Sequence, residues 1–201
     1  MEKQDLDKMF DFFREIDKEK FIGRQTYLTN AVRKENDAEH AWHASLMAIL
    51  LSEYANDKID VLKTVLMILI HDIVEIDAGD TYAYDEEGKK TQQAREQLAA
   101  ERIFGILPED KGKYLYDLWQ EFEYAETPEA KFAHAMDNIQ PLMLNDYTNG
   151  KAWREHGVHL DQVLKRQEKT AEGSHILFEY AVDKLIMPNA VSGALRVESL
   201  S

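Results

Sequence analysis

The apolar residues of this chain recur every three or four positions, and this spacing limits the possible folds more than any other feature of the sequence. Leu6, Met9, Phe10, Phe13 and Ile16 mark one face of a first amphipathic helix, because residues three and four apart share a helical face. Only 4 prolines and 9 glycines occur among 201 residues. The sequence therefore predicts an all-α fold, a single bundle of about seven to nine helices. Beyond the first, helices are expected over residues 38–55, 61–76, 90–105, 107–126, 129–147, 159–172 and 174–187.

Polar residues suited to begin or end a helix stand at the edges of these stretches. Asp37, Asp60 and Thr127 are predicted N-caps, since their side chains can accept hydrogen bonds from the free backbone N–H groups of a first turn. Gly79 is predicted to end one helix and Pro141 to kink another. The remaining segments, residues 21–36, 80–90 and 148–159, are expected to be connections or loops.

Composition and charge exclude several classes of protein. A hydrophobic content of 44% suits one domain, expected over residues 1–187 and followed by a weakly structured tail over 188–201. The apolar stretches are shorter than the roughly 20 residues of a membrane span, and the acidic N-terminus is unlike a secretory signal, so a cytoplasmic protein is expected. The net charge of −14 disfavours binding to nucleic-acid backbones or anionic membranes. Without cysteine, any metal must be bound by histidine and carboxylate side chains.

The stretch "HDIVEIDAGD" at 71–80 places ionisable residues directly after the apolar run "VLKTVLMILI" at 61–70. Buried charges at such a helix end are costly unless a positive group compensates them. On a helix, Glu75 lies on the same face as His71 and Asp72, which precede it by four and three residues. We therefore expect the compensating charge to be a metal ion.

Two further helices offer ligands for such an ion. His40 stands in "AEHAWH" near the start of the second helix, and Asp137 stands in "AHAMDN" within an otherwise apolar helix. Two imidazoles and two carboxylates suit a first-row divalent ion such as Mn, Fe, Co, Ni or Zn better than Ca. One such ion per chain is expected.

A histidine, an adjacent His-Asp pair and a distant aspartate, in this order and spacing, resemble the signature of the HD-domain metal-dependent phosphohydrolases. The stretches "HDIVEIDAGD", "LPEDKGKYLYDLWQEFE" and "TPEAKFAHAMDNIQ" are similar to the 5'-deoxynucleotidase branch of that family, and the resemblance covers roughly residues 5–187. It implies a homodimeric enzyme that removes phosphate from (deoxy)ribonucleoside 5'-monophosphates with a divalent metal.

The resemblance also implies roles for individual residues. His40, His71, Asp72 and Asp137 would be the metal ligands. Glu75 would activate or orient the attacking water, and Asp80 would position that water or the leaving oxygen. Arg24 matches the basic residue that the family places on the phosphate. The family often carries an aromatic residue directly after this arginine, in contact with the sugar, whereas this chain has Gln25.

Other interpretations of the same residues stand beside this one. The substrate of the same site would instead be a phosphodiester, a cyclic nucleotide or a nucleoside triphosphate, or the chain would be a non-catalytic HD module that binds a nucleotide or a partner helix. Glu75 and Asp80 argue against a pure binding module, but alone they also fit solvated acids in a turn, and Arg24 fits a loop ion pair. A ferritin-like di-iron protein would need paired Glu-x-x-His repeats, and the sequence has none.

Overall fold

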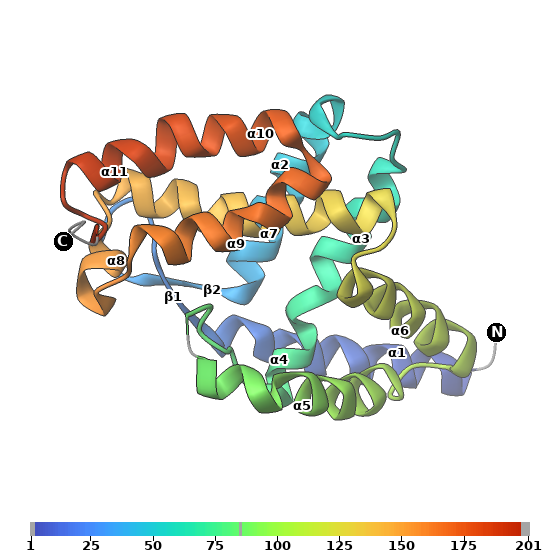
Figure 1. Cartoon of the computed structure of the whole chain (residues 1–201). Helices are drawn as coiled ribbons and strands as arrows, with labels where there is room; N and C mark the ends of the chain where they lie inside the picture. The colour runs from blue at the N-terminus through green and yellow to red at the C-terminus, as the bar shows by residue number, and fades with distance from the viewer. Residues whose placement is uncertain (1–2, 85, 198–201) are drawn as a thin grey trace.

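The computed structural model describes residues 3–84 and 86–197, and it shows a helical bundle with one small hairpin (Figure 1). The all-α prediction is confirmed. Two pairs of consecutively labelled helices each form one continuous rod, so the eleven labelled helices of the described residues make nine separate helices. In chain order the elements are α1 (Lys3–Ile16), β1 (Gly23–Tyr27), β2 (Lys34–Asn36), α2 (Asp37–Leu51), α3 (Val61–Ile70), α4 (Glu75–Ala78), α5 (Glu86–Phe104), α6 (Glu109–Tyr124), α7 (Pro128–Tyr147), α8 (Lys151–His156), α9 (Leu160–Gly173), α10 (His175–Tyr180) and α11 (Met187–Val191).

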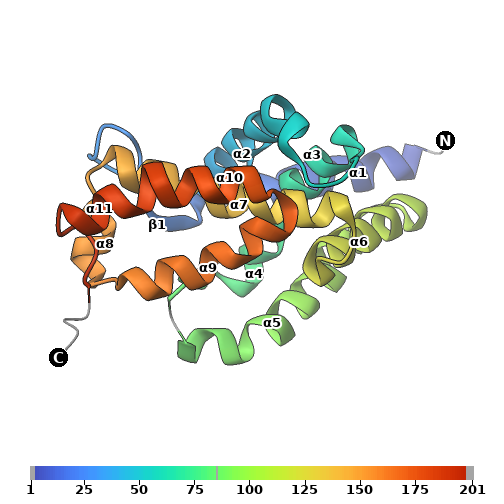
Figure 2. The ribbon, with the colours of Figure 1, turned by 45° about the horizontal axis from the view of Figure 1, so that its top comes forward.

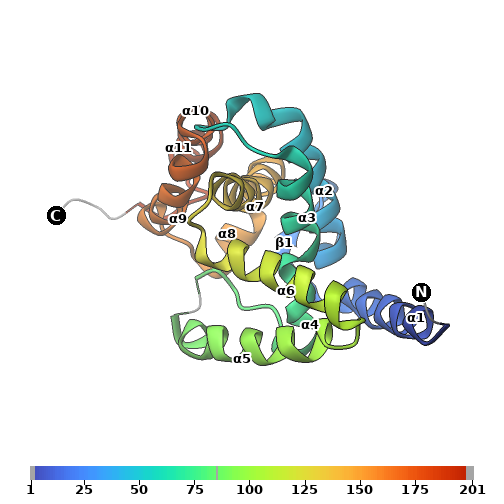
Figure 3. The same cartoon turned by 90° about the vertical axis from the view of Figure 1, so that its right-hand side faces the viewer.

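Helix α7 lies at the centre of the bundle, between α9 and α10 on one side and α2 and α3 on the other (Figure 3). It begins as predicted, with the Thr127 side chain accepting a hydrogen bond from the backbone of Ala130 and with Pro128 in the first turn. Phe132 and Met136 are fully buried. Because α7 is covered on several sides, a polar side chain on it faces the interior and needs a partner there.

The predicted helix over 61–76 is present, but it changes geometry where the ionisable residues begin. Asp60 caps α3 by accepting a hydrogen bond from the backbone of Lys63. Residues His71–Val74 then form a 3₁₀ turn that leads into the short α4, and Gly79 ends it with a φ of 74°. This positive φ is open to glycine at little cost. The tighter turn changes the direction in which His71 and Asp72 project from the rod.

The segment expected as a loop over 21–36 instead contains the antiparallel hairpin of β1 and β2. Its strands are short and mostly polar, "GRQTY" and "KEN", so they lack the apolar alternation that signals a strand. The second helix also begins differently from the prediction. Asn36, not Asp37, is the N-cap, in a capping box with Glu39. Asp37 is thereby released for a buried position.

Two predictions for the C-terminal part are corrected. The expected loop over 148–159 contains α8, and the expected weakly structured tail is ordered from 188 to 197, where it includes most of α11. Leu195 is buried, and the backbone of Arg196 exchanges hydrogen bonds with Val158 and Leu160. Residues 198–201 of the expected tail lie outside the described residues. Because this segment is rich in small residues, its sequence shows little apolar periodicity, although these residues pack closely in the structure.

The apolar side chains form two clusters along the bundle. The larger one joins α1 to α7 and the start of α10, and the smaller one joins α7, α8, α9 and the segment between α10 and α11. Figure 2 shows α5 below α9 and α10, with α4 between α9 and α5. No helix among the described residues is both long and apolar enough to span a membrane.

Candidate metal centre

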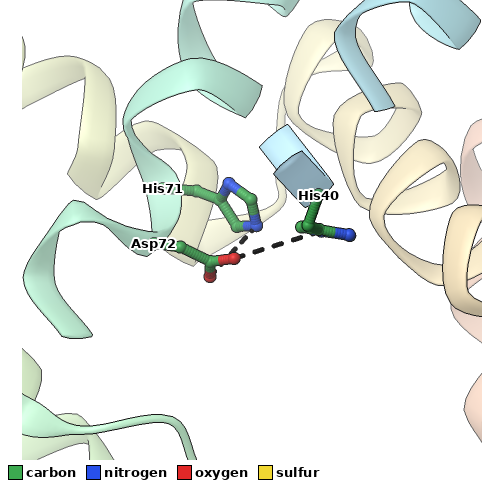
Figure 4. Close-up of side chains that lie close together, drawn as sticks. All are labelled: His40, His71 and Asp72. Carbon is green, nitrogen blue, oxygen red and sulfur yellow. Dashed lines mark ion pairs between the residues drawn. The ribbon is translucent and has the colours of Figure 1, made fainter. Parts of the chain in front are cut away.

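The four side chains expected to bind metal converge from three segments of the chain. His40 comes from α2, His71 and Asp72 from the 3₁₀ turn after α3, and Asp137 from α7. Figure 4 shows His40, His71 and Asp72 turned toward one another, and one ligand atom of each lies within 4.8 Å of the others. The Asp137 Oδ1 atom lies 3.0 Å from His40 Nε2 and 3.7 Å from His71 Nε2. The prediction that these residues meet in space agrees with this geometry.

Hydrogen bonds on the far side of each imidazole determine which nitrogen faces the centre. His71 Nδ1 donates to the backbone carbonyl of Ile68 at 2.7 Å, and His40 Nδ1 donates to Gln140 Oε1 at 2.8 Å. In a neutral imidazole the other nitrogen, Nε2, then carries a lone pair. His71 Nε2 is buried and has no hydrogen-bond partner among the described residues.

The facing atoms therefore all offer electron pairs. His71 Nε2 lies 3.1 Å from Asp72 Oδ1, and His40 Nε2 lies 4.0 Å from Asp72 Oδ2. Lone pairs at these separations repel unless a cation lies among them or a proton binds to an imidazole. Two nitrogen and two oxygen donors in a buried position fit a divalent transition ion.

The nearby acceptor atoms and charges shift the pKa values of the two histidines. Burial alone would lower the pKa of His71, but Asp72 and Asp137 outweigh it and raise that pKa well above its usual value. Burial and the nearby Arg24 lower the pKa of His40 instead. Of the two histidines, His71 is therefore the one that binds the additional proton when no cation is present. A bound ion would replace that proton.

Arg24 lies inside a group of carboxylates. Its Nη1 atom is 2.6 Å from Asp72 Oδ2 and 3.2 Å from Asp37 Oδ1, and only 13% of its side chain is exposed. Burial would lower the pKa of Arg24, but the surrounding acids, led by Asp72, raise it well above its usual value. Arg24 is thus a permanent positive charge at the centre, and its predicted contact with phosphate stays a prediction.

Glu75 and Asp80 lie at the same centre. Glu75 is buried, one of its oxygens has no partner among the described residues, and burial together with Asp72 and Asp37 raises its pKa to about 11. A hydrogen bond from Glu75 reaches Asp37, whose own pKa is raised by burial and by Asp72 to about 8. The two carboxyl groups can therefore share a proton.

Asp80 follows Gly79 in the connection to α5. It is partly buried, and burial raises its pKa while Arg24 opposes that rise. Arg95 of α5 holds the backbone on both sides, because its guanidinium donates to the carbonyl of Ala78 and, at 2.8 Å, to Thr81 Oγ1. Asp80 is therefore held in place by its neighbours along the chain.

Several residues at the centre were not predicted to belong to it. Asp37 was expected as a helix cap, and Glu35 and Gln140 were not singled out. Gln140 follows Asp137 by one helical turn on a covered helix, so its position was a usable signal. Arg166 of α9, whose Nη2 lies 3.9 Å from Asp137 Oδ2, has no local signal because α9 is distant in sequence.

Comparison with known proteins adds to this geometry. A family model described as HD domain matches residues 16–177. The 5'-deoxynucleotidase HDDC2 of Homo sapiens is 29% identical over 136 residues, which cover 67% of this chain and 65% of the human protein. The protein of the same name from Danio rerio is 27% identical over 139 residues, 69% of this chain and 68% of that protein. The chain thus matches about two thirds of the length of these relatives.

Solved structures share the whole fold. The crystal structure of a predicted metal-dependent phosphohydrolase from Magnetospirillum magnetotacticum MS-1 has a TM-score of 0.90 and 46% identity, with 94% of this chain and 95% of that chain covered. A conserved hypothetical protein from Pyrococcus furiosus has a TM-score of 0.64 at 19% identity, covering 90% of this chain and 99% of the other. The second likeness concerns the fold alone.

Proposed function

The chain belongs to the HD domain family, and from this premise we propose that it is a metal-dependent phosphohydrolase that removes phosphate from (deoxy)ribonucleoside 5'-monophosphates. The observation that carries the proposal is the convergence of His40 Nε2 and His71 Nε2 with the carboxylate oxygens of Asp72 and Asp137 in a buried position. The names of the relatives support the choice of a nucleotide monophosphate as substrate.

His40, His71, Asp72 and Asp137 would hold one divalent ion per chain, with Mn, Fe, Co, Ni and Zn as the candidates. When bound, such an ion supplies a Lewis acid for a phosphate oxygen and for the attacking water. The protein contributes the preset orientation of both imidazoles, since each Nδ1–H is already engaged by an acceptor on its far side. The ligands then reorganise little on binding.

Glu75 would transfer the proton of the attacking water. Once Glu75 is ionised its free oxygen can accept a proton, and the proton that it shares with Asp37 then lies on Asp37, which can donate to the other oxygen of Glu75 and keep the carboxylate oriented. A cation held by the neighbouring Asp72 would lower the pKa of Glu75 from its raised value toward the pH at which the enzyme works, because a nearby positive charge favours the carboxylate. Asp80, on its braced loop, would orient the water or the leaving oxygen.

Two arginines that approach Asp137 would bind the phosphate. Arg24 is nearly enclosed by Asp72 and Asp37, whereas the side chain of Arg166 is 29% exposed and its closest ion-pair contact among the described residues is the 3.9 Å approach to Asp137. Arg166 also lowers the pKa of Asp80 against the effect of burial, so it lies near the braced loop. A substrate anion would reach Arg166 at a smaller cost in broken ion pairs.

Replacing Arg166 with glutamine is expected to raise KM for a nucleoside monophosphate about 10–100-fold, because a hydrogen bond to a charged group contributes about 1.5–3 kcal/mol. The matched control is Lys165→Gln, which removes the same charge from the adjacent, exposed position of α9. Steady-state kinetics measures both variants. An equal, small change of KM in the two would show that only the overall charge matters.

Activity of metal-stripped and metal-restored protein tests the proposal as a whole. Ribo- and deoxyribonucleoside monophosphates, a cyclic nucleotide, a phosphodiester and a nucleoside triphosphate are offered with Mn²⁺, Co²⁺, Ni²⁺ or Zn²⁺, and released phosphate is measured. We expect phosphate release from monophosphates only after metal is restored. Preference for a diester or a triphosphate would move the assignment to the alternative substrates, and no turnover with any ester would favour a binding module.

A homodimer is also proposed, and an exposed apolar stripe on α2 supports it. Trp42, Leu46, Ile49 and Leu50 follow helical spacing and are 62%, 42%, 48% and 74% exposed. Such a stripe can pair with itself across a two-fold axis. The same helix carries His40 on its buried face.

A further inference from the structure

A buried amide links the hairpin to one of the proposed metal ligands. Gln140 of α7 is fully buried, and the Glu35 side chain of β2 is 1% exposed. The Gln140 Oε1 atom lies 2.8 Å from His40 Nδ1, and its Nε2 atom lies 2.9 Å from Glu35 Oε2. Residues 100 and 105 positions apart in sequence are thus joined through one side chain.

Burial raises the pKa of Glu35 to about 7 against the opposing effect of Arg24, and when Glu35 is ionised the hydrogen-bonding capacity of each group permits one arrangement of protons. An ionised Glu35 only accepts, so the amino group of Gln140 must face it. The same amino group lies 3.2 Å from His43 Nδ1, which can accept its second hydrogen. The carbonyl oxygen of Gln140 is then left for His40, and this oxygen can only accept a hydrogen bond. His40 must therefore carry its proton on Nδ1, with the Nε2 lone pair facing Asp137.

We propose that Gln140, oriented by Glu35, is a positioning residue that fixes His40 as the Nδ1–H tautomer and thereby sets the affinity of the centre for its divalent ion. The inference rests on the proposed function, since it assumes that His40 is a metal ligand. It assigns no contact with substrate to Gln140 or Glu35.

The same chain of contacts continues to a second proposed ligand. The other oxygen of Glu35 lies 3.9 Å from Arg24 Nε, and Arg24 Nη1 lies 2.6 Å from Asp72 Oδ2. His40 and Asp72 are therefore connected through Gln140, Glu35 and Arg24. Both Glu35 and Arg24 come from the hairpin, so this small sheet positions two of the side chains that connect the proposed ligands.

A purely structural role would have a different signature. Buried glutamines are hydrogen-bonded wherever they occur, and their loss lowers stability at any site. Gln167 of α9 offers the comparison, because it is also buried, accepts from Thr170 at 2.8 Å and donates to the backbone of Asn138 at 3.2 Å. It contacts none of the proposed ligands through these bonds.

The test compares Gln140→Met with Gln167→Met in the full chain. Co²⁺ affinity is measured by competition with a chromophoric chelator, and thermal unfolding of the metal-free proteins is measured alongside. We expect both variants to lose stability, but only Gln140→Met to lose Co²⁺ affinity, by about 10–100-fold, as is typical for partners behind a ligand. Equal Co²⁺ affinity in wild type and Gln140→Met would overturn the proposal.

A reciprocal exchange provides the rescue. In Glu35→Gln/Gln140→Glu the carboxylate at position 140 accepts from His40 Nδ1, and the amide at position 35 donates to that carboxylate. Co²⁺ affinity is therefore expected to lie within about tenfold of wild type. A folded double variant that binds as weakly as Gln140→Met would contradict the model.

One measurement needs no variant. Nitrogen-15 NMR of labelled histidines in the Co²⁺-free protein and with diamagnetic Zn²⁺ is expected to show His40 protonated at Nδ1. A proton at Nε2 in the Zn²⁺-loaded protein would overturn the proposal. Wild type that binds neither ion would refute the metal centre itself, whereas normal binding with the wrong tautomer would refute only the role of Gln140.

Discussion

The Glu75→Gln variant is expected to lose about 10²–10⁴-fold in kcat, because glutamine keeps the shape of the side chain but cannot accept the proton of the attacking water. The metal content should stay that of wild type, since Glu75 is not among the proposed ligands. Turnover is measured with a nucleoside monophosphate at saturating metal, and bound metal by elemental analysis.

Stability should move in the opposite direction from activity. Glu75 lies beside Asp72 and Asp37, and these neighbours together with burial raise its pKa. Removing an acid from this cluster relieves unfavourable burial, so the metal-free variant should melt no lower than wild type. Glu53→Gln, at an exposed position after α2, is the matched control and should change neither property. Unchanged kcat in Glu75→Gln would refute the proposed proton transfer.

Metal addition is expected to raise the melting temperature of stripped wild-type protein by about 5–10 °C when the free ion is at 100 times its Kd, because binding to the folded state alone contributes about 2.7 kcal/mol there. The His71→Gln variant should lose this rise. The substitution removes the His71 Nε2 atom, one of the two nitrogen donors that converge on the centre. Differential scanning calorimetry with Co²⁺ or Mn²⁺ measures the effect.

The control for this prediction is His175→Gln. His175 is exposed at the start of α10 and lies 3.4 Å from Glu179, away from the centre. It should retain the full metal-dependent rise and full activity. If His71→Gln still gained the same stabilisation, the ion would be bound elsewhere and the four-ligand centre would be wrong.

Local patterns in the sequence identified most helices and the types of donor at the centre. The apolar run before His71, the cap residues Asp60 and Thr127, and Gly79 each act over one or two helical turns, so they can be recognised without a fold. The hairpin was not predicted because its strands carry no apolar alternation, and α8 was not predicted because it is only six residues long.

The assignment of Asp37 shows how a local signal can mislead. Asp37 and Asn36 are both suitable caps, and the sequence offers no local reason to choose between them. In the structure Asn36 takes the cap with Glu39, and Asp37 turns inward to Arg24 and Glu75. The partners of the buried Asp37, Arg24 from the hairpin and Glu75 from α4, lie outside the cap itself, so the cap signal contains no information about them.

The sequence by itself determined the helical class of this protein, the position of the ionisable stretch at 71–80 and the histidine and carboxylate donors available for a metal, because helix periodicity and residue chemistry are local properties. Only the tertiary structure decided that His40 and Asp137, 97 positions apart, approach to 3.0 Å. It likewise decided that Gln140 and Glu35 lie behind His40 and that Arg166 faces Asp137. These contacts follow from how amphipathic helices pack around α7, and packing selects among many arrangements that the local pattern leaves equally open.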